Sequence, residues 1–186
     1  MNINDLKKTG LVIKYNNEPY QIIFSQHSRT ARGGAFVRTK LKNLITGQTL
    51  EKTFNSSDKI EEADIEKIKT NFLYSDQEKS FFMNKANYEQ FFLKNNTLDN
   101  KKNFLKEGET IETLLFNNKP VNIILPQKVD LKVIESPPNI KGDSATSPSK
   151  NVILETGASL NVPIFIKKDD LIRVNTETGE YVSRVS

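Results

Sequence analysis

The sequence predicts an all-β protein composed of three small β-barrel domains. Short apolar segments recur along all 186 residues, and clusters of Gly, Pro, Asn, Asp and Ser separate them. Apolar and polar side chains often alternate within these segments, which is the period of a β-strand. No stretch has the apolar spacing of a long amphipathic helix. The segments fall into three sets of about 60 residues, each large enough for a small barrel.

The first set covers residues 1–64 and predicts a small, strongly twisted barrel. Turn residues at Asn16-Asn17 and Thr46-Gly47 separate its strands. The run 27–34 indicates a loop at a hairpin tip, ending in Gly33-Gly34, where glycine supplies the positive φ of a tight turn. An acidic segment, 57–68, indicates a short helical or extended connector. Strands are expected over 11–15, 20–25, 35–42 and 48–54.

The second set covers residues 65–127 and is rich in aromatic side chains. Aromatic residues on strands either fill a small core or stack on nucleic-acid bases, and the core interpretation is favoured. Strands are expected over 67–74, 79–84, 88–93, 110–116 and 120–125, with a short helix over 100–105. The aromatic residues are Phe72, Tyr74, Phe81, Phe82, Tyr88, Phe91, Phe92, Phe104 and Phe116.

The third set covers residues 128–186. Its segment 137–149 is rich in Pro, Gly and Ser and indicates a long loop. Strands are expected over 129–135, 152–154, 159–162, 171–174 and 181–185. Two consecutive units of five strands match the size of oligonucleotide/oligosaccharide-binding (OB) barrels. Other small barrels share this pattern, so the pattern alone leaves the barrel type open.

Positive charge is concentrated in the first set. The whole chain has a net charge of +4, but residues 1–64 carry 10 Lys/Arg and 7 Asp/Glu, whereas residues 128–186 carry 8 of each. The predicted strand over 35–42 places Phe36, Arg38, Lys40 and Lys42 on one face. Such clustering suits a phosphate backbone, although a solvated strand face explains it equally well. Six cations lie between residues 26 and 54, against one carboxylate: Arg29, Arg32, Arg38, Lys40, Lys42 and Lys52.

Several kinds of chemistry have no support in the sequence. The chain contains no cysteine and one histidine, so the usual nitrogen and sulfur ligand sets for a metal cannot form. We interpret His27 as a strand-end histidine that makes one hydrogen bond. No phosphate-binding glycine motif is present, and the pairs Glu61-Glu62 and Asp169-Asp170 point to opposite sides of a strand. We therefore expect no enzyme activity and no cofactor.

Targeting signals are also absent from the sequence. The first eight residues lack the apolar core of a signal peptide, and no apolar run reaches the roughly 20 residues that span a membrane. The lack of cysteine fits a reducing compartment. We expect a cytoplasmic protein without a membrane partner.

Three motifs resemble the bacterial translation elongation factor P family. The segment 33–44, GGAFVRTKLKNL, is similar to the family signature, and 178–185, TGEYVSRV, is similar to the end of its third domain. The segment 160–166, LNVPIFI, resembles another third-domain motif. The resemblance implies an SH3-like (KOW-like) N-terminal barrel followed by two OB-fold barrels, in an L-shaped arrangement that mimics tRNA. Asp169 stands where a glycine is usual in the family.

The resemblance also implies a function. Family members bind the 70S ribosome between the peptidyl and exit tRNA sites and relieve stalling at consecutive prolines, by positioning peptidyl-tRNA for peptide-bond formation. The implied contacts to tRNA and rRNA are Arg29, Arg32, Gly33, Gly34, Arg38, Lys40 and Lys42, and the implied ribosome contacts of the third domain are Tyr181 and Arg184. The expected protein is a monomer. The alternative is a paralogous or general RNA-binding barrel protein that does not act on proline-stalled ribosomes.

The tip residue departs from the commonest family pattern. Thr30-Ala31-Arg32-Gly33 stands where a Pro-Gly-Lys-Gly loop carries a lysine extended by β-lysine. Arg32 lacks the amine that accepts this group. In another subgroup an arginine at this position receives rhamnose, which implies a glycosyltransferase partner. A rhamnosylated, an otherwise modified and a bare Arg32 all remain open.

Overall fold

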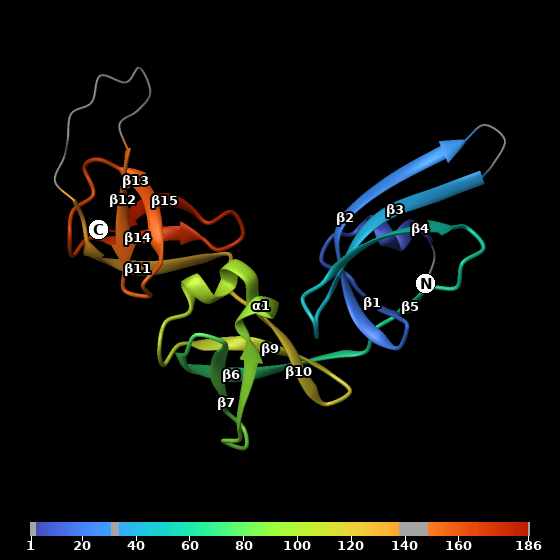
Figure 1. Cartoon of the computed structure of the whole chain (residues 1–186), viewed down its shortest axis with the longest axis horizontal. Coiled ribbons are helices and arrows are strands. Elements are labelled where there is room, and N and C mark those ends of the chain that lie inside the picture. Colours follow the sequence, from blue (N-terminus) through green and yellow to red (C-terminus); the bar gives the residue numbers. More distant parts are fainter. Residues whose placement is uncertain (1–2, 31–33, 138–148, 186) are drawn as a thin grey trace.

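The computed structural model describes residues 3–30, 34–137 and 149–185. Its strands form three five-stranded antiparallel sheets, which we name the N-terminal, central and C-terminal units. The molecule is elongated and bent, with the central unit at the bend and the other two units at opposite ends (Figure 1). The all-β prediction is confirmed. Among the described residues, no helix is long and apolar enough to cross a membrane.

The N-terminal unit has the strand order β4-β3-β2-β1-β5. Asn16 and Asn17 join β1 to β2 with φ values of 51° and 63°. Both lie in the left-handed region, which Asn tolerates and which suits a two-residue hairpin turn. The connector expected over 57–68 is extended. The elements are the 3₁₀-helix η1 (Ile3–Lys7), β1 (Val12–Tyr15), β2 (Glu18–Thr30), β3 (Gly34–Asn43), β4 (Thr49–Asn55) and β5 (Glu61–Glu62).

The central unit has the strand order β10-β9-β6-β7-β8. Phe72, Phe82 and Leu98 lie in its core, and Leu98 belongs to α1, which begins five residues before the helix expected over 100–105. The buried hydroxyls of Thr70 and Thr113 share a hydrogen bond of 2.7 Å. The elements are β6 (Ile65–Ser75), β7 (Lys79–Asn84), β8 (Gln90–Lys94), α1 (Asn95–Leu98), the 3₁₀-helix η2 (Asp99–Phe104), β9 (Thr110–Phe116) and β10 (Lys119–Ile124).

The C-terminal unit has the strand order β13-β12-β11-β14-β15, the same arrangement as the central unit read from the other edge. In both the central and the C-terminal unit the first strand is in the middle, and the third and fifth strands approach one another, which closes a barrel. Asp169 has φ 72°, the left-handed conformation that favours glycine, and its carboxylate lies 2.8 Å from the Lys132 ammonium. The strands are β11 (Lys128–Glu135), β12 (Ser149–Leu154), β13 (Ser159–Pro163), β14 (Leu171–Asn175) and β15 (Glu180–Val185).

An apolar cluster joins the N-terminal and central units. It contains Leu44 and Ala63 from the first unit and its connector, together with Leu114, Phe116 and Val121 from β9 and β10. Because this cluster is separate from the cores of both units, it stabilises their contact directly. We propose domain divisions at 64/65 and 127/128, between the last strand of one sheet and the first strand of the next.

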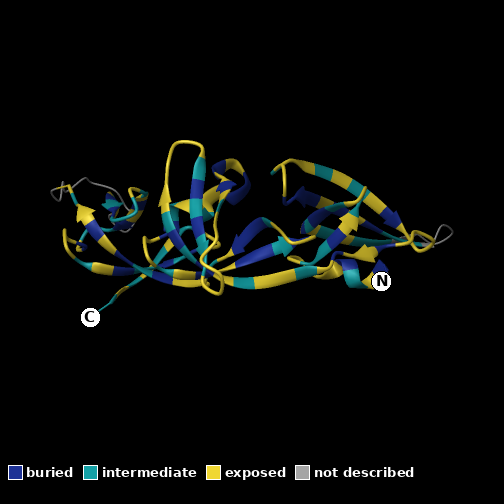
Figure 2. Ribbon diagram, turned by 90° about the horizontal axis from the view of Figure 1, so that it is seen from below, coloured by how far each residue is buried: buried dark blue, intermediate teal, exposed yellow. Residues whose placement is uncertain are grey.

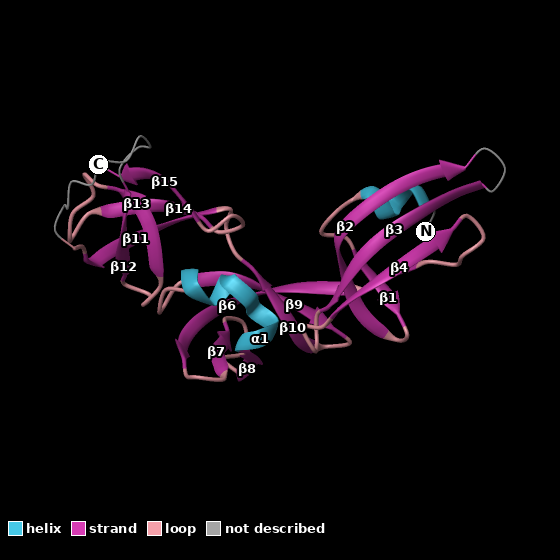
Figure 3. Ribbon diagram, turned by 45° about the horizontal axis from the view of Figure 1, so that its top comes forward, coloured by secondary structure: helices cyan, strands magenta, loops and turns pink. Residues whose placement is uncertain are grey.

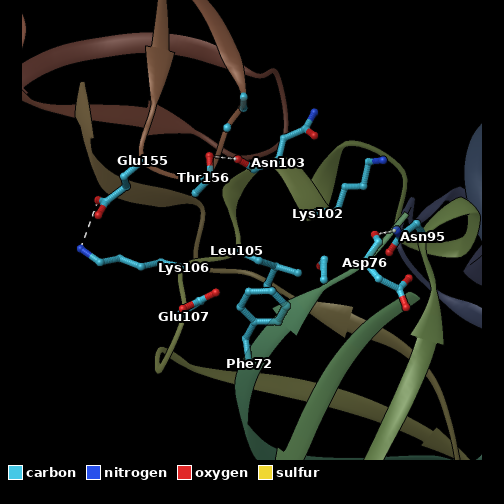
Figure 4. A pocket seen from close by; sticks show the side chains of 13 residues that line it. Phe72, Asp76, Asn95, Lys102, Asn103, Leu105, Lys106, Glu107, Glu155 and Thr156 are labelled. Atoms are coloured by element: carbon cyan, nitrogen blue, oxygen red, sulfur yellow. Dashed lines mark hydrogen bonds and ion pairs between the residues drawn. The ribbon is translucent and has the colours of Figure 1, made fainter. Parts of the chain in front are cut away.

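A second junction joins the central and C-terminal units. Phe104, at the end of η2, packs in the core of the C-terminal unit. Beside it a cleft of about 500 Å³ has mostly polar walls (Figure 4). The Thr156 hydroxyl donates a hydrogen bond of 2.7 Å to the Asn103 carbonyl, and the Lys106 ammonium lies 3.1 Å from the Glu155 carboxylate. These contacts cross between the units.

Candidate nucleic-acid interface

The β2–β3 ribbon is the part of the molecule that carries the predicted tip. The two strands pair antiparallel from Tyr20 opposite Asn43 to Thr30 opposite Gly34, and they extend beyond the other strands of the N-terminal unit (Figures 1 and 3). The prediction of a loop from His27 was wrong as far as Thr30. Polar side chains suggested a loop, but a two-stranded ribbon pairs its own backbone groups and needs no apolar face at its end.

A β-bulge between Ile22 and Phe24 changes the character of the ribbon. Ile22 is fully buried, whereas Phe24 is 53% exposed opposite Lys40. A bulge inserts one unpaired residue, here Ile23, and increases the local twist. It marks the point at which the ribbon leaves the barrel core.

The outer face of the ribbon carries exposed cations. Arg38 pairs with Gln26 and Lys40 with Phe24, and both cationic side chains are exposed. The Arg38 guanidinium carbon lies 5.7 Å from the centre of the Phe36 ring, a cation–π contact that orients the side chain. A shallow cleft of about 350 Å³ follows this face, lined by Phe24, Gln26, Arg38, Thr39, Lys40, Glu51, Lys52 and Thr53.

The inner face of the ribbon is buried. Val37 and Leu41 lie in the core, and the Thr39 hydroxyl donates a 2.9 Å hydrogen bond to the Lys52 carbonyl. Figure 2 shows this alternation of buried and exposed residues along the strands. The predicted division of the strand into two faces is confirmed for the residues from Phe36 to Leu41.

The single histidine is on the ribbon rather than at a strand end. His27 lies within β2, opposite Val37. Within the described part of the chain, neither of its ring nitrogens has a hydrogen-bond partner, although both atoms are buried. The prediction of one hydrogen bond is therefore wrong here, because an apolar valine faces the ring across the ribbon.

Lys42 lies in a different environment from Arg38 and Lys40. It is 8% exposed, and its ammonium forms an ion pair with the Asp99 carboxylate of the central unit. Burial lowers the pKa of Lys42. Alternation placed Lys42 on the correct face, but at this height the central unit covers that face. Lys42 therefore connects two units and does not share the exposed surface of the other two cations.

Lys101 is a partly buried cation that the sequence did not distinguish. Its ammonium donates hydrogen bonds to the Asn122 side-chain oxygen (2.9 Å) and the Ile123 carbonyl (2.7 Å). Burial, together with the positive charge of Lys42, lowers the pKa of Lys101 to about 8. No sequence motif marks this position, because the acceptors come from β10, more than 20 residues away.

The two strands of the ribbon lead up to the predicted tip. Arg32, Gly33 and the adjoining Ala31 lie outside the described residues, so the predicted turn at Gly33-Gly34 has no structural test. Arg29 lies in β2 opposite Ala35, and Gly34 begins β3 opposite Thr30. The backbone pairing therefore brings the two ends of the tip segment together.

The predicted contacts of the third domain lie on β15. Tyr181 pairs with Val174 and Arg184 with Ile172, two buried residues on one face of β14. A bulge interrupts this pairing between Arg173 and Val174, but burial still alternates along β15, as the spacing of three residues between Tyr181 and Arg184 predicts. Tyr181 packs against the core, whereas the Arg184 side chain is about half exposed.

Comparison with known proteins covers nearly the whole chain. Three family models match in order: the elongation factor P KOW-like domain (residues 2–60), the elongation factor P OB domain (residues 65–123) and the elongation factor P C-terminal domain (residues 129–184). Elongation factor P from Phytoplasma australiense is 48% identical over 185 residues, covering 99% of this chain and 97% of the relative. The chain belongs to the elongation factor P family.

A second relative gives the same assignment. Elongation factor P from Moorella thermoacetica is 41% identical over 181 residues, covering 97% of both chains. The chain is therefore a translation elongation factor whose family membership implies association with the ribosome. The family models also confirm the predicted KOW-like N-terminal barrel and the OB fold of the central unit.

Proposed function

We propose that this factor binds the ribosome between the peptidyl and exit tRNA sites and promotes peptide-bond formation at consecutive prolines. The observation that supports this most strongly is the β2–β3 ribbon, which is paired up to Thr30 and Gly34 and carries exposed Arg38 and Lys40. In this proposal Arg32 contacts the CCA end of peptidyl-tRNA.

The proposed mechanism is positioning without covalent chemistry. Peptide-bond formation requires the attacking amine and the ester in reactive geometry, and correct positioning can lower such a barrier by several kcal/mol. Proline is a sterically poor partner in this reaction, so unproductive geometry is the fault that a positioning factor corrects. A permanently charged, planar guanidinium suits the phosphates and hydroxyls of a nucleotide backbone.

The exposed cations of the ribbon have a separate role in this proposal. Arg38 and Lys40 bind phosphates of tRNA or rRNA, and Arg29 is assigned to the same contact. Lys42 is omitted because its ammonium already pairs with Asp99. Tyr181 and Arg184 contact the ribosome from the C-terminal unit, and the factor acts as a monomer.

The decisive experiment replaces Arg32 by Ala and measures synthesis of a peptide containing Pro-Pro-Pro on purified ribosomes. Rescue of stalled synthesis should disappear while the circular dichroism spectrum stays unchanged. Undiminished rescue would refute the assigned role of Arg32. The intact mass of the native factor, with a peptide map across Arg32, would show whether a glycosyltransferase or another enzyme modifies this residue.

A second experiment tests the phosphate contacts. Arg38→Ala and Lys40→Ala should each weaken ribosome binding and reduce its dependence on salt, because each lost phosphate contact releases about one counterion fewer. Lys119→Ala, an exposed lysine on β10 of the central unit, is the matched control and should change neither quantity. An unaltered salt slope in the first two variants would contradict their role. Ribosome binding without rescue of proline stalls would favour a general RNA-binding protein.

A further inference from the structure

A row of aromatic side chains crosses the outer face of the central unit. Tyr74 on β6 pairs with Phe81 on β7, and Phe81 pairs with Phe92 on β8. Residues that pair across strands share one face of a sheet, so the three rings form a continuous row. We name these three residues the aromatic platform.

The platform is distinct from the aromatic core of the same unit. Phe82 is fully buried and stacks on Phe91 with ring centres 5.6 Å apart. The neighbouring Phe81 and Phe92 point to the other face because side chains alternate along a strand. Each Phe-Phe doublet thus turns one ring toward the core and the other toward the outer face of the sheet.

The two outer rings of the platform are exposed, Phe81 between them is partly buried, and all three are ordered by contact with one another. Tyr74 is 50% exposed and Phe92 is 49% exposed. Tyr74 stacks on Phe81 with centres 4.6 Å apart and 23° between the ring planes, and Phe81 lies 6.2 Å from Phe92. Mutual packing holds the rings in position and leaves ring surface open to a ligand.

Cations lie at one edge of the platform. The Lys79 ammonium lies 4.3 Å from the centre of the Phe92 ring, and Lys94 pairs with Lys79 across the two strands. The nearby Asp76 carboxylate accepts hydrogen bonds from the backbone N–H groups of Glu78 and Lys79, which fixes it in the β6–β7 turn. The platform therefore combines ring surface with two lysines that pair across β7 and β8.

We propose that the aromatic platform binds unpaired RNA, with bases stacked on Tyr74 and Phe92 and phosphates beside Lys79 and Lys94. Aromatic side chains interleaved with cations are the usual means of binding single-stranded nucleic acid without sequence preference. The second and third strands of an OB barrel, here β7 and β8, form a face that suits an oligonucleotide. An apolar protein segment fits less well, because its docking would bury two ammonium groups without acceptors.

A single-tryptophan reporter tests the proposal directly. The chain contains no tryptophan, so Phe92→Trp introduces one fluorophore into the platform while keeping an aromatic ring. Titration of the full chain with a 12-nucleotide oligouridine should quench this fluorescence and reach saturation. Phe165→Trp is the matched control, because Phe165 is 54% exposed but lies in the C-terminal unit. Its fluorescence should respond weakly or not at all.

Affinity measurements separate the platform from the basic ribbon. An Arg38→Ala/Lys40→Ala double variant removes exposed cations of the N-terminal unit, and platform changes are made in this background. Tyr74→Ala and Phe92→Ala should each weaken oligouridine binding at least about fivefold, the lower end for loss of one base stack. Tyr74→Phe should bind normally because it keeps the ring, and Phe165→Ala should also bind normally.

Two results would overturn the proposal. One is unchanged oligouridine affinity in both alanine variants with native circular dichroism spectra. The other is a change in Phe92→Trp fluorescence on adding ribosomal proteins stripped of RNA, with no change on adding oligouridine. That result would show that the platform binds protein. Neither measurement uses intact ribosomes or proline-rich peptides, so the outcome is independent of the function proposed above.

Discussion

Gly47 provides a sharp test of the junction between the N-terminal and central units. It has φ +76°, and a Cβ atom added there would lie 2.9 Å from the Asn96 carbonyl oxygen of the central unit. Gly10 has φ +89°, and an added Cβ would meet no atom within 4 Å. Gly47→Ala and Gly10→Ala therefore impose similar backbone strain, but only the first disturbs the junction.

The expected loss of stability in each variant follows from the backbone strain and from the contact with Asn96. A left-handed conformation costs a residue with a Cβ about 1–2 kcal/mol, which applies to both variants. At Gly47 the Asn96 backbone must also move by about half an ångström before the contact reaches an ordinary 3.4 Å. Such overpacking costs typically about 1–3 kcal/mol. We expect Gly47→Ala to lower the free energy of unfolding by that amount more than Gly10→Ala does.

Urea unfolding followed by circular dichroism measures this difference, and small-angle X-ray scattering reports whether the bend between the units changes. Gly47→Ala should alter the scattering curve, whereas Gly10→Ala should leave it unchanged. Equal destabilisation by the two variants, with identical scattering curves, would show that Gly47 is required only for its turn. The inferred close contact with Asn96 would then be wrong.

Three further predictions concern polar groups that are buried or pair with a buried partner. Asp99→Asn should lower the free energy of unfolding by about 1 kcal/mol more than Lys42→Met, because only Asp99→Asn leaves the buried Lys42 ammonium without its carboxylate. Urea unfolding of both variants measures which of them is less stable. The pKa of Lys101 is lowered from 10.5 to about 8, so the unfolded chain binds more protons between these values. Stability should therefore rise with pH across that window, and Lys101→Met should flatten the rise in thermal unfolding. Thr70→Val should cost about 1–3 kcal/mol by leaving the Thr113 hydroxyl unpaired, while Thr70→Val/Thr113→Val should recover most of it in a double-mutant cycle.

Much of the strand pattern could be predicted because its causes are local. Alternation and turn residues indicated most strands of all three units, and Asn16-Asn17 has the left-handed φ values that its turn requires. Lengths were less predictable. The strand expected over 20–25 continues to Thr30, because pairing with β3 compensates for polar side chains that favour a loop.

The environments of individual side chains depended on distant residues. Period-two spacing correctly placed Lys42 on the face of Arg38 and Lys40, but nothing in its neighbourhood indicated that Asp99 would cover it. The bulge between Arg173 and Val174 in the pairing of β14 with β15 likewise has no marker in the sequence. A strand pattern specifies a face, whereas the burial of that face depends on how separate units pack.

The burial of the aromatic residues was also only partly predictable from the sequence. The sequence favoured core filling for the aromatic residues of the second set, and Phe72 and Phe82 are indeed buried. Adjacent aromatic residues cannot both enter the core of one sheet, because neighbours on a strand face opposite ways. The adjacent pair Phe81-Phe82 therefore indicates that one of the two rings lies outside the core, although the aromatic composition of the segment does not.

The junction between the N-terminal and central units bears directly on the proposed function. A positioning factor must hold its tip at a defined place relative to its other contacts. If the two units could move relative to one another, the tip would sample many orientations, and the gain from positioning would be lost. The apolar cluster around Leu44 and Phe116 and the ion pair of Lys42 with Asp99 restrict that freedom. Under the proposed function, residues that touch no RNA are therefore as necessary for positioning as Arg32. Loosening this junction should reduce rescue of stalled synthesis more than it reduces ribosome affinity, whereas loss of Arg38 or Lys40 should do the reverse.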